Sequence, residues 1–123
     1  CPSYAEVQLT ASNCPANDNR ASATLLSGNT FPTCGTTNGN LVAATNSPEA
    51  TSAEPSGAGQ DVWYRFVAQT NGVRIQATNN SGANNLVIEL QNNDGSQIIA
   101  IENETTTGNE VLVANNLVPG QTY

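Results

Sequence analysis

The chain has 123 residues, 37% of them hydrophobic and 11% charged, and its formal net charge is −7. Its length suits one domain. The basic residues are Arg20, Arg65 and Arg74, too few for the basic face that nucleic-acid binding requires. The sequence contains no Lys, His or Met, which excludes a Ser-His-Asp or Cys-His catalytic arrangement and a Schiff-base lysine. We therefore expect a single domain that is not an enzyme and does not bind nucleic acid.

The three cysteines, Cys1, Cys14 and Cys34, predict one disulfide and one remaining sulfur. A Cys14–Cys34 bond would close a loop of about twenty residues and stabilise the fold by roughly 3 kcal/mol. Cys1 would then pair outside the chain or with one of these two. Because the chain starts at Cys1 without an initiator Met, we expect it to come from a longer precursor. No apolar run approaches the roughly 18 residues of a membrane helix, so no membrane insertion is expected.

The N-terminal half contains few regular patterns. Apolar and polar side chains alternate from Tyr4 to Leu9, which predicts a half-buried strand or a connector. We interpret residues 1–12 as a linker or N-terminal strand and residues 13–123 as the domain. The compact segment from Arg20 to Leu26 fits either a single helical turn or a short strand. Between Ser27 and Gln60 the chain makes an irregular excursion, which the predicted disulfide would hold in place.

The second half begins with a strongly apolar segment. Residues 61–68, DVWYRFVA, carry large apolar groups on both faces and predict a central strand. Asn71-Gly72 follows, the pair that most readily adopts positive φ in a hairpin. Residues 73–77 then alternate apolar and polar side chains. A first hairpin is therefore expected, and its second strand should be buried on one face.

The remaining elements repeat this pattern. Residues 86–91 and 98–101 flank a turn at Asn92–Gly95 and predict a second hairpin. Residues 111–117 form the last complete apolar run, and Val118–Gly120 turns the chain. Strands spaced by about 8–12 residues with Asn and Gly turns between them predict an all-β sandwich or barrel. Its predicted core comprises Val62, Trp63, Tyr64, Phe66, Ile75, Leu86, Ile88, Leu90, Val111 and Val113.

Three segments carry a family resemblance: Cys14–Asn19 with Ala23 and Leu25 behind it, then Asp61–Phe66, then Leu117–Tyr123. Together they resemble the jelly-roll modules of secreted Bacteroidetes proteins, which are related to the bacterial pre-peptidase C-terminal domain. The resemblance covers the chain from about Cys14 to the end. It implies an antiparallel jelly-roll β-sandwich, present as a repeat module in adhesins and hydrolases that Gram-negative cells export through the type IX system. It also implies an extracellular or cell-surface location.

The resemblance bears on two further features. The family pattern has a Cys where this chain has Arg20, so Cys14 would stand in for it as the partner of Cys34. In the family a further strand begins at the Tyr of the PGQTY turn, which implies that this chain stops one or two strands early. Three explanations stay open for the resulting edge: the remainder lies outside the chain, a partner supplies the missing strand, or the sheet is complete. The edge residues are Gln121, Thr122 and Tyr123.

Several side chains are candidates for a functional site. Asp18 and Asp61 lie at turns or strand starts among oxygen-rich neighbours, as calcium ligands do, and Asp94 lies at a similar turn. An Asp at a turn also commonly caps its own backbone. Trp63 and Tyr64 could stack against a sugar ring, but their position between apolar neighbours favours core packing.

Glu102 and Glu104, with Glu110 nearby, could be considered paired carboxylates for glycoside hydrolysis, but their position near a strand end favours a solvated surface. The leading hypothesis is a non-catalytic, extracellular structural and adhesive module with calcium as a candidate cofactor. Its expected partners are neighbouring domains of the same polypeptide and a glycan or protein surface ligand. One alternative is an accessory carbohydrate- or substrate-binding domain of a secreted hydrolase. Another is a strand-sharing subunit of a surface filament.

Overall fold

The computed structural model of the chain describes five stretches of sequence: residues 14–26, 36–49, 60–79, 85–103 and 109–123. Their elements are the 3₁₀ turn η1 (Arg20–Ser22) and the strands β1 (Thr24–Leu25), β2 (Tyr64–Arg65), β3 (Val73–Ala77), β4 (Ile88–Gln91), β5 (Ile98–Glu102) and β6 (Glu110–Ala114). The predicted all-β class is confirmed. Across these stretches no helix has the length and apolar character to cross a membrane. The linker or strand expected at residues 1–12 lies outside the described residues.

Residues 63–68 are central to one layer of the fold. On one side β1 pairs with β2 in parallel, and Thr24 N–H donates to the Trp63 carbonyl at 3.0 Å. On the other side the chain pairs in antiparallel fashion with residues 121–123, where Phe66 and Tyr123 exchange two backbone hydrogen bonds of 2.9 Å. The central strand predicted at residues 61–68 is thus present in part: β2 covers Tyr64–Arg65, Val67 adds an isolated bridge, and the chain is paired on both sides. The segment from Arg20 to Leu26 contains both of its expected alternatives, η1 followed by β1.

The predicted second hairpin is present. β4 and β5 pair in antiparallel register around the Asn92–Gly95 turn, with a shift in register between Leu90 and Gln91. Gly95 adopts a φ of +73°, which an L-amino acid with a side chain rarely tolerates. Gly95 N–H donates to the Asn92 carbonyl at 3.0 Å and closes the turn. The Asn and Gly residues of the Asn92–Gly95 turn were thus enough to predict that β4 and β5 pair.

The predicted first hairpin is wrong. β3 pairs with β6 in antiparallel register, and residues 69–72 carry the chain away from residues 61–68. The register places Val73 opposite Ala114 and Ile75 opposite Leu112, so that four apolar side chains share one face. Burial of this long-range apolar set, which the local Asn71-Gly72 signal did not reveal, explains the pairing.

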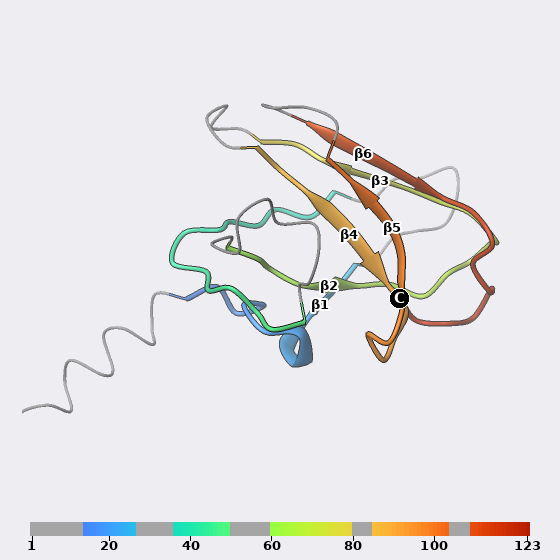
Figure 1. Cartoon of the computed structure of the whole chain (residues 1–123), viewed down its shortest axis with the longest axis horizontal. Helices are drawn as coiled ribbons and strands as arrows, with labels where there is room; N and C mark the ends of the chain where they lie inside the picture. The colour runs from blue at the N-terminus through green and yellow to red at the C-terminus, as the bar shows by residue number, and fades with distance from the viewer. Residues whose placement is uncertain (1–13, 27–35, 50–59, 80–84, 104–108) are drawn as a thin grey trace, which may run out of the picture.

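One hydrophobic core lies between the layer that contains residues 63–68 and the β3–β6 and β4–β5 pairs. Its buried members come from residues 66–68, from β4, from β6 and from the segment after β6: Phe66, Ala68, Leu90, Leu112, Ala114 and Leu117. Leu26 and Tyr123 pack against it, and the Phe66 and Tyr123 rings stack with centroids 6.0 Å apart. Figure 1 shows β3, β6, β5 and β4 as neighbours in the upper part of the molecule, with β1 and β2 crossing below them.

The predicted core position of Val113 is wrong, because this side chain is 61% exposed while Leu112 is only 1% exposed. Val113 lies opposite Arg74, on the outer face of the β3–β6 pair. The run from Glu110 to Ala114 has apolar residues in both phases of the strand alternation, and the phase that fills the core buries Glu110, Leu112 and Ala114. Glu110 is 1% exposed, so the solvated surface expected for it is also wrong.

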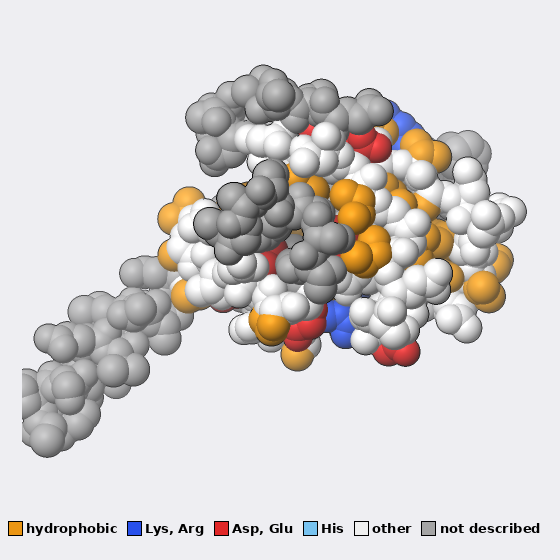
Figure 2. All heavy atoms as spheres, in the orientation of Figure 1, with side chains coloured by type: hydrophobic (Ala, Val, Ile, Leu, Met, Phe, Trp, Pro, Cys, Tyr) orange, Lys and Arg blue, Asp and Glu red, His pale blue; other side chains and the backbone are white. Residues whose placement is uncertain are grey.

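The other predicted core residues are buried or half-buried. Phe66 and Leu90 are buried, and Ile75 and Ile88 are half-buried against the core. Tyr64 is half-buried, and its hydroxyl occupies the space that a side chain at Gly39 would need. The remaining half-buried residues of the predicted set are Val62, Trp63, Leu86 and Val111. On the face drawn in Figure 2, hydrophobic side chains gather on the surface over β4 and β5.

Candidate functional site

Two of the predicted site residues, Asp18 and Asp61, lie in one group of polar side chains. We call this group the Asp18–Asp61 cluster; it comprises Asn17, Asp18, Thr45, Ser47, Asp61 and Trp63. It joins the turn before η1, the irregular segment 36–49 and the start of the central segment 61–68. Asn17, Asp18 and Ser47 are between 4% and 8% exposed, so much of this polar surface is removed from water.

Asp18 holds the segment 36–49 at Thr45. One carboxylate oxygen accepts the Thr45 backbone N–H at 2.6 Å, and the other accepts the Thr45 hydroxyl at 2.8 Å. Its own backbone N–H donates to the Pro15 carbonyl at 3.1 Å, which closes the turn that presents the side chain. Hydrogen bonds to an ionised carboxylate are stronger than those between neutral groups. Asp18 therefore accepts both hydrogen-bond donors of Thr45, a residue 27 positions away.

Asp61 holds the same segment two residues further on. Oδ2 accepts the Ser47 backbone N–H at 2.7 Å, and Oδ1 accepts the Ser47 hydroxyl at 2.6 Å and the Trp63 indole N–H at 2.8 Å. The Ser47 hydroxyl also lies 3.1 Å from the Asp18 carbonyl. Since the hydroxyl has one proton, the nearer and charged acceptor, Asp61, takes it. Asp61 N–H in turn donates to the Thr45 carbonyl at 3.2 Å.

Trp63 connects this cluster to the rest of the fold. Its backbone N–H donates to the Asn17 carbonyl, and the Asn17 amide donates to the Trp63 carbonyl, both at 2.9 Å. The Arg20 guanidinium lies 5.9 Å from the centroid of the Trp63 ring and also donates to the backbone carbonyls of Asn92 and Asn93 in the β4–β5 turn. The cation–π contact covers part of the indole face. Arg20 thus fastens this hairpin turn to the side of the cluster.

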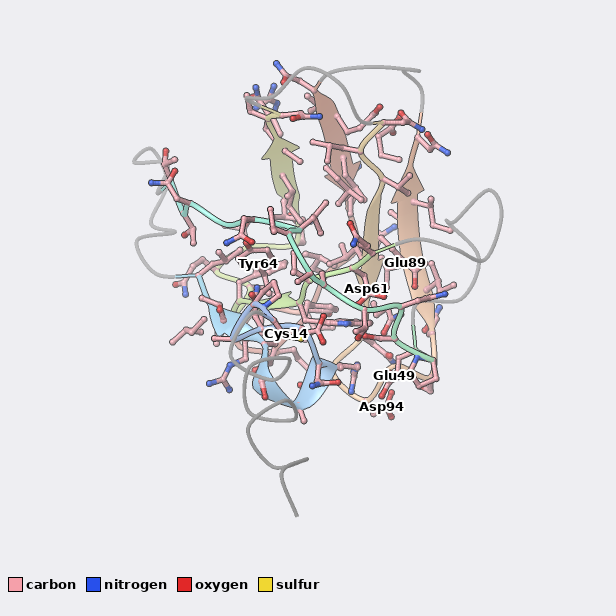
Figure 3. The ribbon with its side chains drawn as sticks, turned by 90° about the vertical axis from the view of Figure 1, so that its left-hand side faces the viewer. Cys14, Glu49, Asp61, Tyr64, Glu89 and Asp94 are labelled. Carbon is pink, nitrogen blue, oxygen red and sulfur yellow. The ribbon has the colours of Figure 1, made fainter. Side chains whose placement is uncertain are left out.

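Asp94 lies at the β4–β5 turn and, in Figure 3, well below Asp61. Its carboxylate accepts the Ser96 backbone N–H at 2.9 Å. Hydrogen bonds from the Ser96 hydroxyl and then from this N–H hold the pKa of Asp94 below its usual 3.8, and the nearby Arg20 charge acts in the same direction. A depressed pKa means that the interaction stabilises the folded chain above pH 3.8 and that this contribution is lost as the pH falls through the folded pKa.

We expect a carbon-detected NMR titration of the Asp94 carboxyl to give a midpoint below 3.8 in the folded chain. Ser96→Ala should raise that midpoint, because it removes the hydroxyl donor and leaves the backbone one. A wild-type midpoint at or above 3.8 would contradict the hydrogen-bonded turn.

The structure brings Asp18 and Asp61 together, but their carboxylate oxygens accept N–H and O–H groups of the chain. In the described residues no group of three or more His, Cys, Asp or Glu side chains could hold a metal ion. The calcium site at Asp18 and Asp61 stays a prediction. Thr45, Ser47 and Asn17 were missed as members of the cluster, since nothing in the sequence links residues 14 to 46 positions apart.

The remaining predicted site residues are the cysteines, the glutamates near the end of β5 and the edge residues 121–123, and the structure describes some of them. Cys14 is half-buried, whereas Cys1 and Cys34 lie outside the described residues, so the disulfide stays a prediction. Glu104 lies outside them as well, and Glu102 is half-buried on β5. The edge residues 121–123 pair with residues 66–68, as described above.

Comparison of the chain with protein-family models, with curated proteins and with solved structures finds no match.

Proposed function

We propose that this chain is a non-catalytic, extracellular structural and adhesive module of a large secreted or cell-surface protein. The observation that supports the proposal best is the use of the polar residues in the Asp18–Asp61 cluster. Asp18 and Asp61 accept hydrogen bonds from Thr45 and Ser47, and so fasten an irregular segment to the layer that contains Trp63. A binding module needs loops that a rigid scaffold holds in place.

The composition supports the same proposal. A net charge of −7 with three arginines and no Lys or His suits a solvated surface far better than nucleic-acid binding or acid–base catalysis by His. The disulfide predicted from the cysteines would fit an oxidising, extracellular setting, where such bonds persist. The proposed partners are neighbouring domains of the same polypeptide and a protein or glycan surface ligand that contacts the loops or strand edges.

The proposal is tested by giving the purified chain two assays in parallel. In the first, beads coated with the chain are presented to glycan and protein arrays. In the second, the chain is incubated with a panel of glycosidase, esterase and peptidase substrates. We expect saturable adhesion to a surface ligand and no turnover. Turnover that rises in proportion to the concentration of folded chain would overturn the proposal, and so would the absence of any adhesion.

A further inference from the structure

Two buried oxygen atoms on β4 have no hydrogen-bond partner among the described residues: Glu89 Oε2 and Gln91 Oε1. Glu89 and Gln91 are two residues apart on β4, on either side of the register shift between Leu90 and Gln91, and a hydrogen bond joins their side chains. Gln91 is only 7% exposed. Its amide donates to Glu89 Oε1 at 2.5 Å and to the Glu49 carbonyl at 2.8 Å. The amide therefore joins the two side chains that carry the unpartnered oxygens; Figure 3 labels Glu89.

The orientation of the Gln91 amide follows from these contacts. Both neighbours of its nitrogen, Glu89 Oε1 and the Glu49 carbonyl oxygen, are acceptors. Turning the amide over would place its oxygen against two other oxygens and would lose both hydrogen bonds. Gln91 Oε1 thus remains an unpartnered acceptor, and a buried acceptor of this kind is costly.

The Glu89 carboxylate also lacks a compensating charge in the described part of the chain, since one oxygen contacts a neutral amide and the other has no partner. The arginines serve elsewhere: Arg20 donates to the β4–β5 turn, Arg74 donates to Gln76, and Arg65 is exposed on β2. The sequence has no Lys or His. A half-buried carboxylate without a positive partner is unfavourable, and a net charge of −7 attracts cations from solution.

We propose that Glu89 and Gln91 bind a calcium ion through their two unpartnered oxygens, Glu89 Oε2 and Gln91 Oε1. A carboxylate oxygen and an amide oxygen are hard donors of the kind that calcium takes, and water completes the six to eight ligands of the ion. The ion neutralises Glu89 and gives the Gln91 oxygen a partner, which a neutral water molecule would do only in part. This site differs from the one predicted at Asp18 and Asp61, whose oxygens are occupied by hydrogen bonds. The inference does not depend on the proposed function.

Sites with few charged ligands bind calcium weakly, with a Kd of about 10⁻⁴ to 10⁻³ M.

To test the site, metal is removed from the whole chain with EDTA. Calcium chloride is then added, and binding is followed by titration calorimetry and by the Tm of thermal unfolding. Glu89→Gln tests the site. Asp94→Asn removes the same charge from the exposed β4–β5 turn and serves as the matched control. In the wild-type chain, ¹³C NMR of the Glu89 carboxyl follows binding directly and does not depend on whether a variant folds.

We expect calcium at about ten times its Kd to raise the Tm of the wild-type chain and of Asp94→Asn by about 5 °C. Glu89→Gln should bind calcium at least 10-fold more weakly and, without calcium, should be at least as stable as wild type. The Glu89 carboxyl signal should shift with calcium and only weakly with magnesium. The inference is overturned if 10 mM calcium moves neither the Tm nor that signal, which would leave an ordered water molecule at the site. It is also overturned if Glu89→Gln keeps the calcium response and Asp61→Asn loses it.

Discussion

Replacing Leu112 with Ala is expected to lower the free energy of unfolding by about 2–5 kcal/mol, the usual cost of a cavity at a fully buried leucine. Leu112 is 1% exposed and lies opposite Ile75 in the β3–β6 pair, at the centre of the hydrophobic core. Neighbouring backbone in two strands restricts how far the site can collapse around the missing atoms. Urea unfolding followed by Trp63 fluorescence measures the change.

Val113 provides the matched control for Leu112, because it is the next residue on the same strand and its side chain is 61% exposed. Val113→Ala should change the free energy of unfolding by no more than about 0.5 kcal/mol. If Val113→Ala lowers the free energy of unfolding as much as Leu112→Ala or more, then β6 faces the core with its other side.

Replacing Asp61 with Ala is expected to cost about 2–4 kcal/mol of folding stability, since charge-assisted hydrogen bonds to the Ser47 N–H, the Ser47 hydroxyl and the Trp63 indole are lost together. Ser47 is 4% exposed, so its N–H is left buried without the carboxylate. Asp61→Asn should recover part of the loss, because its amide oxygen still accepts one of these donors. Equilibrium unfolding in urea measures the free energy of unfolding of the wild-type chain, Asp61→Ala and Asp61→Asn.

Asp94→Ala removes the same charge from an exposed turn and is the control for Asp61. Its loss of stability should be a small fraction of the loss at Asp61, because the turn hydrogen bonds to Ser96 are solvent-exposed. Equal losses at the two positions would indicate that the net charge of the chain, and not the hydrogen bonds of the cluster, sets the effect.

One of the two hairpins that local turn residues predict is present, and the strand pairs between distant segments could not be predicted from the sequence. The β4–β5 hairpin follows from the Asn92–Gly95 turn between two alternating segments. The β3–β6 pair brings residues 73–77 against residues 110–114, and no local signal specifies that partner. The exposed position of Val113 has a related cause, because the run EVLVA fits both phases of a strand until the partner strand is known.

In the candidate site too, some residues could be predicted from the sequence and their distant partners could not. The sequence predicts Asp18 and Asp61 as calcium ligands because each lies at a turn or strand start among oxygen-rich neighbours, whereas the structure shows them accepting hydrogen bonds from the chain. Their partners Thr45 and Ser47 lie in an irregular segment without any pattern of its own. The buried face of β4 was missed because an alternating strand predicts solvent around Glu89 and Gln91, whereas Gln91 is buried.

The Asp18–Asp61 cluster fastens the segment 36–49 to the layer that contains Trp63. Native-state hydrogen exchange tests this attachment most directly through the backbone amides of Thr45 and Ser47, which donate to Asp18 and Asp61. We expect both amides to exchange at least 100-fold more slowly than the amide of Val42, whose hydrogen bond to Asn40 is exposed. Asp61→Ala should remove the protection of Ser47. Exchange of Thr45 and Ser47 at the rate of Val42 in the wild-type chain would contradict this attachment.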